Sequence, residues 1–155
     1  MEIKYYNGDV LTSNADVIMH QVNCQGSFNS GVAKAVKDKY IDVYNQYSSF
    51  CKTQKSKDLL GQVLYVKIDE NRYIANLFGQ EYYGYKGGKY TSYDAIDKCL
   101  KNVAENAINA GVKTIALPFK MSSDRGGADW DVILALIKSA FNNTNITIEI
   151  WKFNN

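Results

Sequence analysis

Two kinds of apolar periodicity alternate along this chain, and that alternation limits the folds open to it. Short β-type runs cover residues 3–6, 16–22, 62–68, 72–78, 113–117 and 146–153. Helical spacing covers residues 30–47, 92–110 and 130–141. Strands separated by helices predict parallel pairing, and the short turn at residues 69–71 predicts one antiparallel hairpin. We therefore expect a three-layer α/β/α sandwich with a mixed central sheet.

Composition narrows the classes of function. The net charge of +2 is too small for a dedicated nucleic-acid surface, and only Arg72 and Arg125 supply guanidinium groups. No stretch reaches the ~20 apolar residues of a membrane span. The cysteines are widely spaced and form no CxxC pair, which argues against a zinc site or a disulfide framework. We expect a cytoplasmic monomer of one domain, residues 1–155, with no metal, no cofactor, and no nucleic-acid or membrane partner.

Three loops leave the carboxyl ends of predicted strands, which is where open α/β sheets bind ligands: residues 7–16, 22–30 and 118–127. In the second loop, polar side chains follow an apolar strand, and Ser30 and Gly31 open the next helix. Backbone amides at a helix N-terminus can hold a phosphate, although helix capping alone also explains Ser30. The third loop, with two serines and two glycines, has the same two interpretations: a phosphate cradle or an ordinary turn.

Several motifs, found in one order along nearly the whole chain, resemble those of macrodomains. They are Asn7-Gly8-Asp9-Val10, the runs from His20 to Gly26 and from Ser30 to Ala35, Ile74 to Gln80, Tyr90 to Ala95, Ile115 to Lys120, and Gly126 to Trp130. The similarity is closest to a branch of small bacterial and viral ADP-ribose-1″-phosphate phosphatases and de-ADP-ribosylating macrodomains. It implies metal-independent hydrolysis of an ADP-ribose derivative, with ADP-ribosylated protein as a further partner. The alternative is a non-catalytic module that reads or sequesters ADP-ribose or a related nucleotide.

The resemblance also implies ligand contacts. Asp9 would accept a hydrogen bond from the adenine amino group beside the Val10 amide, and Phe119 would pack against adenine or the proximal ribose. Without the resemblance, Asp9 is better interpreted as the cap of a turn. Backbone amides after Ser30 would face the diphosphate, and polar side chains of the second loop would line the distal ribose. The further implied contacts are Gln25, Ser30, Gly31, Val32, Ala33, Gln80, Ser122, Ser123, Asp124, Arg125 and Gly126.

His20, Asn23 and Asp129 are the implied catalytic residues. His20 is the only histidine of the chain, and an imidazole can act as general acid or base near neutral pH. Asn23 would act at the distal ribose, and Asp129 would orient a water or the histidine. The alternatives are a structural histidine and, for Asp129, an acid at a helix N-terminus. Four tyrosines after the fourth predicted strand form either a lid or an ordinary surface: Tyr82, Tyr83, Tyr85 and Tyr90.

The chain departs from the macrodomain pattern at three places. The third loop has Ser122, Ser123 and Asp124 where glycine-rich relatives bring amides close to the diphosphate. Asp124 adds a like charge there, which Arg125 can neutralise. Phe28-Asn29 stands where relatives tend to carry Met-Gly, and Gln80 lies near the position of a lysine in relatives that cleave ADP-ribosyl-glutamate. We therefore expect weakened ADP-ribose binding or a shifted ligand, and no lysine-dependent mechanism.

Overall fold

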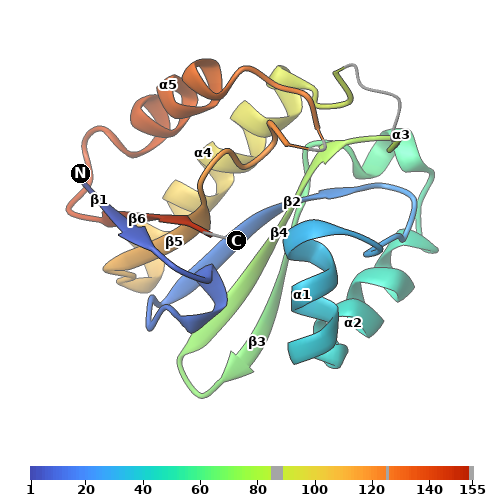
Figure 1. Cartoon of the computed structure of the whole chain (residues 1–155), viewed down its shortest axis with the longest axis horizontal. Helices are drawn as coiled ribbons and strands as arrows, with labels where there is room; N and C mark the ends of the chain where they lie inside the picture. The colour runs from blue at the N-terminus through green and yellow to red at the C-terminus, as the bar shows by residue number, and fades with distance from the viewer. Residues whose placement is uncertain (85–88, 125, 154–155) are drawn as a thin grey trace.

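Six strands form one sheet in the computed structural model, which describes residues 1–84, 89–124 and 126–153 (Figure 1). The order across the sheet is β1-β6-β5-β2-β4-β3. In chain order the strands are β1 (Glu2–Asn7), β2 (Val17–Asn23), β3 (Val63–Asp69), β4 (Arg72–Gln80), β5 (Thr114–Pro118) and β6 (Thr147–Lys152). Neighbouring strands run parallel except in the β3–β4 hairpin, so the predicted mixed sheet is confirmed.

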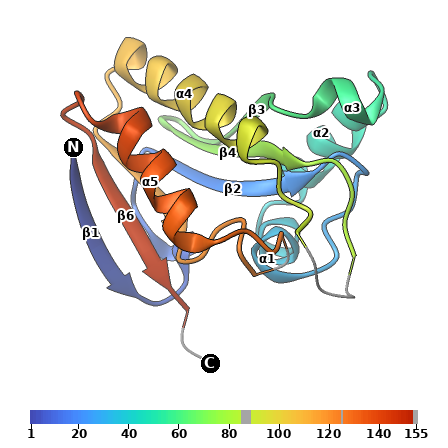
Figure 2. The same ribbon diagram turned by 90° about the horizontal axis from the view of Figure 1, so that it is seen from above.

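Helices cover both faces of this sheet. On one face lie α1 (Gly31–Lys39), α2 (Ile41–Cys51), α3 (Ser56–Leu59) and the 3-10 turn η1 (Val10–Thr12). The other face is covered by α4 (Tyr93–Ala110) and α5 (Trp130–Phe141). Figure 1 shows the two helical layers on opposite sides of the strands, and Figure 2 shows β1 and β6 side by side at one end of the sheet. The predicted three-layer sandwich is confirmed.

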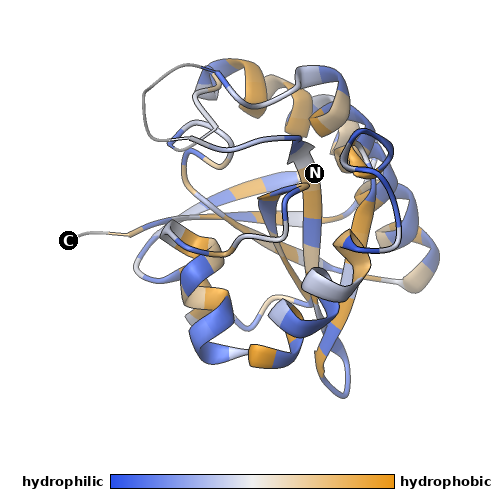
Figure 3. Ribbon diagram, turned by 90° about the vertical axis from the view of Figure 1, so that its right-hand side faces the viewer, coloured by the Kyte–Doolittle hydropathy of each residue, from blue (hydrophilic) through white to orange (hydrophobic). Residues whose placement is uncertain are grey.

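The central strand β2 contributes to both hydrophobic cores. Val17 and Met19 pack in the core under α4 and α5, whereas Ile18 and Val22 pack in the core with α1 and α2. This follows from the strand geometry, because successive side chains point to opposite faces. Figure 3 shows hydrophobic and hydrophilic residues mixed along both the strands and the helices. The same alternation sends the next two side chains of β2, His20 and Gln21, to opposite faces.

The helix predicted over residues 30–47 is wrong in one respect, because it is two helices that meet at Tyr40. Tyr40 has φ −132° and ψ 73°, outside the helical region, and its amide donates to the Val36 carbonyl oxygen at 2.7 Å as α1 ends. The apolar spacing continues through both helices, so it does not reveal the break. The two short elements η1 and α3 were not predicted either, and β4 continues two residues beyond its predicted end.

The predicted loops 22–30 and 118–127 leave the carboxyl ends of β2 and β5, which are paired parallel neighbours. Because β2 also pairs parallel with β4, the end of β4 lies beside them. Polar groups from three chain segments therefore converge at one edge of the sheet. Within the described ranges, no helix is long and apolar enough to cross a lipid bilayer.

Candidate functional site

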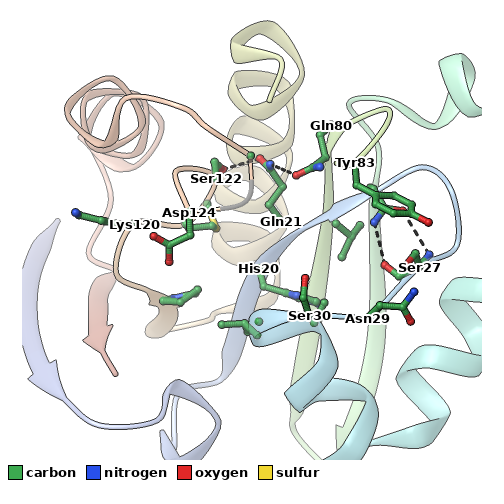
Figure 4. A pocket seen from close by; sticks show the side chains of 18 of the residues that line it. His20, Gln21, Ser27, Asn29, Ser30, Gln80, Tyr83, Lys120, Ser122 and Asp124 are labelled. Carbon is green, nitrogen blue, oxygen red and sulfur yellow. Dashed lines mark hydrogen bonds between the residues drawn. The ribbon is translucent and has the colours of Figure 1, made fainter. Parts of the chain in front are cut away.

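An open pocket lies where β2, β4 and β5 end and α1 begins. It encloses about 850 Å³ of space, counting the part that is open to solvent. It is lined by residues 20–23, 27, 29–33, 80, 83–84, 118–122, 124 and 126. Figure 4 shows side chains from these segments around the cavity. It brings together these predicted site residues: His20, Asn23, Ser30, Gly31, Val32, Ala33, Gln80, Phe119, Ser122, Asp124 and Gly126.

The N-terminus of α1 forms one wall. Ser30 is the N-cap residue, but its side chain makes no capping hydrogen bond, and its hydroxyl lies in the pocket wall (Figure 4). The first amides of a helix lack intrahelical partners, so those of Gly31, Val32 and Ala33 stay available to an anion. Gly31 has φ +60°, a left-handed conformation that suits glycine, and it is exposed. This wall has the chemistry of a phosphate-binding turn.

His20 lies at the base of the pocket and is almost completely buried. Its Nε2 lies 2.7 Å from Asn76 Oδ1, and Asn76 Nδ2 donates to the Leu64 carbonyl oxygen at 2.9 Å. Because the Asn76 amide nitrogen is thus engaged, Nε2 is the protonated ring nitrogen and Nδ1 is an acceptor. Nδ1 is buried without a hydrogen-bond partner among the described residues. Burial lowers the pKa of His20 to about 4, so the imidazole is neutral at pH 7.

Asn23 holds the turn that follows β2. Its Oδ1 accepts hydrogen bonds from the Gln25 amide at 2.9 Å and from the Tyr47 hydroxyl at 2.9 Å, while Nδ2 donates to the Ser27 carbonyl oxygen at 2.9 Å. The side chain is therefore engaged at both ends within its own loop. Behind it, burial raises the pKa of the Cys24 thiol to about 12, so this thiol is not a thiolate nucleophile at neutral pH.

The described residues of the 119–127 loop form the opposite wall, and two of them have a glycine-like backbone. Lys120 has φ +61° and Ser122 has φ +72°, both in the left-handed region that residues with a Cβ avoid. The serine therefore keeps a left-handed conformation of the kind that glycine adopts easily. Asp124 is exposed and lines the same pocket, and Figure 4 shows its carboxylate on the side of the loop away from Gln80.

Several predicted site residues lie outside the pocket lining. Asp9 Oδ1 accepts from the Leu11 amide at 2.9 Å, so Asp9 caps η1, and Val10 is buried in the core. Asp129 Oδ1 accepts from the Asp131 amide at 2.9 Å and caps α5 instead of facing His20. For both acids the structure shows the capping role that the sequence left as the alternative.

The remaining predicted residues of the two loops also lie elsewhere. Gln25 is exposed and its Nε2 donates to the Glu81 carbonyl oxygen at 3.0 Å, on the outer side of the turn. The Ser123 hydroxyl is buried without a partner in the described parts of the chain, away from the pocket lining. Arg125 and Tyr85 lie outside the described residues.

The aromatic residues divide between the pocket and its rim. The Phe119 ring stacks on Trp130, with ring centroids 5.4 Å apart, and the ammonium groups of Lys120 and Lys152 lie 5.7 and 5.6 Å from its centre. Tyr83 lines the pocket, whereas Tyr82 is 59 % exposed and is not one of the lining residues. Phe119 therefore offers only part of its surface to a ligand.

The sequence prediction missed several pocket residues, of which Gln21 is the most central. Gln21 hydrogen-bonds to Gln80, Thr91 and Ser122. Gln21 lies inside the His20–Gly26 motif. Its position near the end of β2, after the alternating apolar residues, could have indicated a pocket residue. Asn29 and Lys120 were also missed as pocket residues, because loops of this kind carry no periodicity that would mark them.

No group of three or more histidine, cysteine or acidic side chains among the described residues is arranged to hold a metal ion. The charged lining residues in that part of the chain are Lys120 and Asp124. The pocket therefore offers a ligand mainly neutral hydrogen-bonding groups and helix-terminal amides.

Comparison with known proteins identifies the family. The sequence model of the Macro domain matches residues 19–137. An ADP-ribose 1″-phosphate phosphatase of Debaryomyces hansenii is 26% identical over 180 aligned positions, which cover 96% of this chain and 98% of that protein. A DNA ADP-ribosyl glycohydrolase of Mycobacterium tuberculosis is 24% identical over 142 residues, which cover 90% of this chain but 38% of that protein. This chain therefore corresponds to well under half of the mycobacterial relative.

The fold agrees with that assignment. The solved structure of a Bacteroides thetaiotaomicron protein of unknown function superposes with a TM-score of 0.86 at 29% sequence identity, and the match covers 98% of both chains. The family match covers β4, β5, β2 from Met19 onward and the N-terminus of α1, which together build the pocket. The chain belongs to the Macro domain family.

Proposed function

We propose that the protein binds ADP-ribose in this pocket and hydrolyses the bond that joins the distal ribose of an ADP-ribose derivative to its phosphate, protein or DNA substituent. The observation that carries the proposal is the uncapped N-terminus of α1, whose first amides face the pocket at the carboxyl ends of three strands. Membership of the Macro domain family and the named activities of the two relatives support this ligand.

The diphosphate would lie between the N-terminus of α1 and the 119–127 loop. Gly31, Val32 and Ala33 supply amide donors on one side, and the left-handed backbone at Ser122 shapes the other. Donors fixed by the fold need no reorganisation when they bind an anion, which favours both affinity and charge stabilisation. The adenine contact at Asp9 and Val10 would extend the ligand beyond the pocket lining, and it would require Asp9 to keep its capping bond with one oxygen.

The chemistry of His20 is that of a neutral hydrogen-bond acceptor. Its pKa of about 4 makes it unsuitable as an acid at neutral pH, but Nδ1 can accept a hydrogen bond from a water or from a ribose hydroxyl. In the proposed reaction His20 orients the attacking water, and Asn23 keeps the surrounding turn in shape. Most of the rate enhancement then comes from positioning.

The test uses binding and turnover together. Calorimetry with ADP-ribose is expected to show binding, and ADP-ribose-1″-phosphate, ADP-ribosylated protein and ADP-ribosylated DNA serve as substrates. His20→Ala is expected to lower kcat about tenfold, the effect of one lost hydrogen bond in the transition state, with little change in ADP-ribose affinity. A wild-type protein that fails to bind ADP-ribose at about 1 mM would overturn the proposal.

A second candidate function is a binding module without turnover. Two observations favour it: the acidic side chain of Asp124 in the pocket wall and the engagement of the Asn23 amide within its own turn. Tight binding of ADP-ribose with no release of phosphate or ADP-ribose from any of the three substrates would establish this function instead. A cytoplasmic location suits either function, since all three cysteines are free thiols.

Replacing Asp124 with asparagine should strengthen ADP-ribose binding. The carboxylate lines the pocket that would receive the diphosphate, but it is exposed, so solvent screens most of the repulsion. We expect Asp124→Asn to lower the Kd by about three- to tenfold, with a smaller gain at about 0.5 M salt than at about 0.05 M. The matched control is Asp42→Asn, which removes an exposed acid from the first turn of α2, outside the pocket. Equal or weaker binding by Asp124→Asn would show that the carboxylate does not oppose the ligand.

A further inference from the structure

Polar side chains from four distant parts of the chain meet on the α4 side of the pocket. Gln21 Nε2 donates to Gln80 Oε1 and to Thr91 Oγ1, both at 2.8 Å. Gln21 Oε1 accepts from the Ser122 hydroxyl at 2.5 Å, and Thr91 Oγ1 donates to the Ser122 carbonyl oxygen at 2.9 Å. Figure 4 shows Gln21 between Ser122 and Gln80. We call Gln21, Gln80, Thr91 and Ser122 the Gln21 network.

The network ends on a residue with a strained backbone. Ser122 has φ +72°, which places its Cβ in an unfavourable position that glycine would avoid. Such a conformation persists only where the surroundings hold it, and Ser122 is held at both ends. Its hydroxyl is bound by Gln21, and its carbonyl oxygen accepts from Thr91 and from the Ala128 amide at 3.0 Å.

The network also has little room to rearrange. A Cβ added at Gly126 would overlap Thr91 Oγ1 and the Ser122 carbonyl oxygen, and one added at Gly79 would overlap Gln21 Oε1. Backbone therefore approaches the polar groups closely from two directions. Gln80, Thr91 and Ser122 are buried, so breaking one bond would leave a polar group without water. Gln21 is fixed in a single arrangement by these neighbours.

We propose that Gln21 is a positioning residue, whose side chain holds Ser122 in the left-handed conformation and so sets the shape of the 119–127 loop. Glycine would adopt this backbone conformation without strain. At Ser122 the hydrogen bond between the serine hydroxyl and Gln21 stabilises the same conformation. The consequence for ligand affinity rests on the proposed function, whereas the consequence for the loop itself does not.

The sharpest test compares two substitutions at one position. Ser122→Ala keeps the Cβ but removes the bond to Gln21, so the loop should leave its left-handed conformation and the Kd for ADP-ribose should rise about tenfold. Ser122→Gly removes both the strain and the need for the bond, so it should raise the Kd at least about fivefold less than Ser122→Ala does. Gln21→Leu should match Ser122→Ala, and Gln21→Leu with Ser122→Gly should regain most of the lost affinity.

A second readout needs no ligand. The Met121 amide donates to the Pro118 carbonyl oxygen at 3.0 Å and the Ser123 amide to the Lys120 carbonyl oxygen at 2.9 Å, so their hydrogen exchange reports on the loop. Exchange at both should rise at least about tenfold in Ser122→Ala and in Gln21→Leu, and stay near wild type in Ser122→Gly. The control is Gln62→Leu, which removes a half-buried glutamine that bonds to Gln54 and Asp58, outside the pocket.

The outcomes separate the two claims. The positioning role is overturned if Ser122→Gly raises the Kd and the exchange rates as much as Ser122→Ala does. It is also overturned if Gln21→Leu changes them no more than Gln62→Leu does. If Gln21→Leu does not fold, the two Ser122 variants decide the question alone. If wild type binds no ADP-ribose while the exchange pattern is as expected, the proposed function fails and the positioning role stands.

Discussion

Lowering the pH from 6.5 to 4 is expected to reduce the free energy of unfolding of the wild-type protein. The reduction should be about 3 kcal/mol larger than in a variant without the histidine. The reason is the burial of His20, which lowers its pKa from 6.5 to about 4 in the folded state. In the unfolded chain the imidazole is exposed and keeps its ordinary pKa, so it binds a proton at a higher pH than in the folded protein. Between these two pKa values the unfolded state therefore holds more protons than the folded state.

The direction of the effect follows from that difference. The contribution of His20 to the free energy of unfolding is complete above pH 6.5, where both states carry a neutral imidazole. It is lost as the pH falls toward 4. Each unit of pKa shift corresponds to about 1.4 kcal/mol. Since the chain has a single histidine, one substitution removes the whole contribution.

The measurement is urea unfolding at several pH values for wild type and His20→Gln. Glutamine keeps a side-chain donor for Asn76 Oδ1 but does not titrate in this range. Carboxylates contribute equally to both proteins, so the difference between the two pH curves isolates the imidazole. Parallel curves between pH 4 and pH 6.5 would mean that His20 keeps an ordinary pKa and is more accessible to water than the structure indicates.

Phe28→Ala is expected to lower the unfolding free energy by about 3–5 kcal/mol, the range for truncating a buried phenylalanine. Phe28 is 1 % exposed and stacks on Tyr47 with ring centroids 4.2 Å apart. It also meets the His20 ring edge-on at 5.5 Å. Truncation would leave a cavity between the turn after β2 and α2, directly beneath the pocket.

Two further variants serve as controls for Phe28→Ala. Phe28→Met fills most of the same space with a flexible apolar side chain, and it should cost less than about 1.5 kcal/mol. Phe153→Ala removes a 65 % exposed ring and should change stability by less than about 0.5 kcal/mol. Urea unfolding at pH 7 measures all three. A Phe28→Ala variant within 1 kcal/mol of wild type would show that the turn repacks around the smaller side chain.

Elements with long, regular patterns were predictable, and breaks within them were not. Helix α4 ends at Ala110 with Gly111 in the left-handed conformation, as its apolar spacing and its glycine predict. The break at Tyr40 lacks such a signal, because the apolar positions of α1 and α2 follow one continuous helical spacing. A backbone turn without glycine or proline depends on what the two helices pack against.

The pocket shows the same division. Ser30, Gly31 and the third loop were predicted because loops at the carboxyl ends of parallel strands must meet at one edge of the sheet. The Gln21 network was not, since its hydrogen bonds join residues 59, 70 and 101 positions apart. Side-chain pairing over such separations depends on the register of several strands at once.

The amino-acid pattern was enough to predict the alternation of the six strands with the longer helical segments, the two apolar faces of β2 and the positions of the loops that carry the site. These follow from local periodicity, which each segment expresses through its own backbone geometry. The neutral state of His20 and the glycine-like backbone of Ser122, in contrast, depend on contacts made in the folded protein. Desolvation and hydrogen-bond partners come from segments that meet only in the folded chain, so no local pattern encodes them.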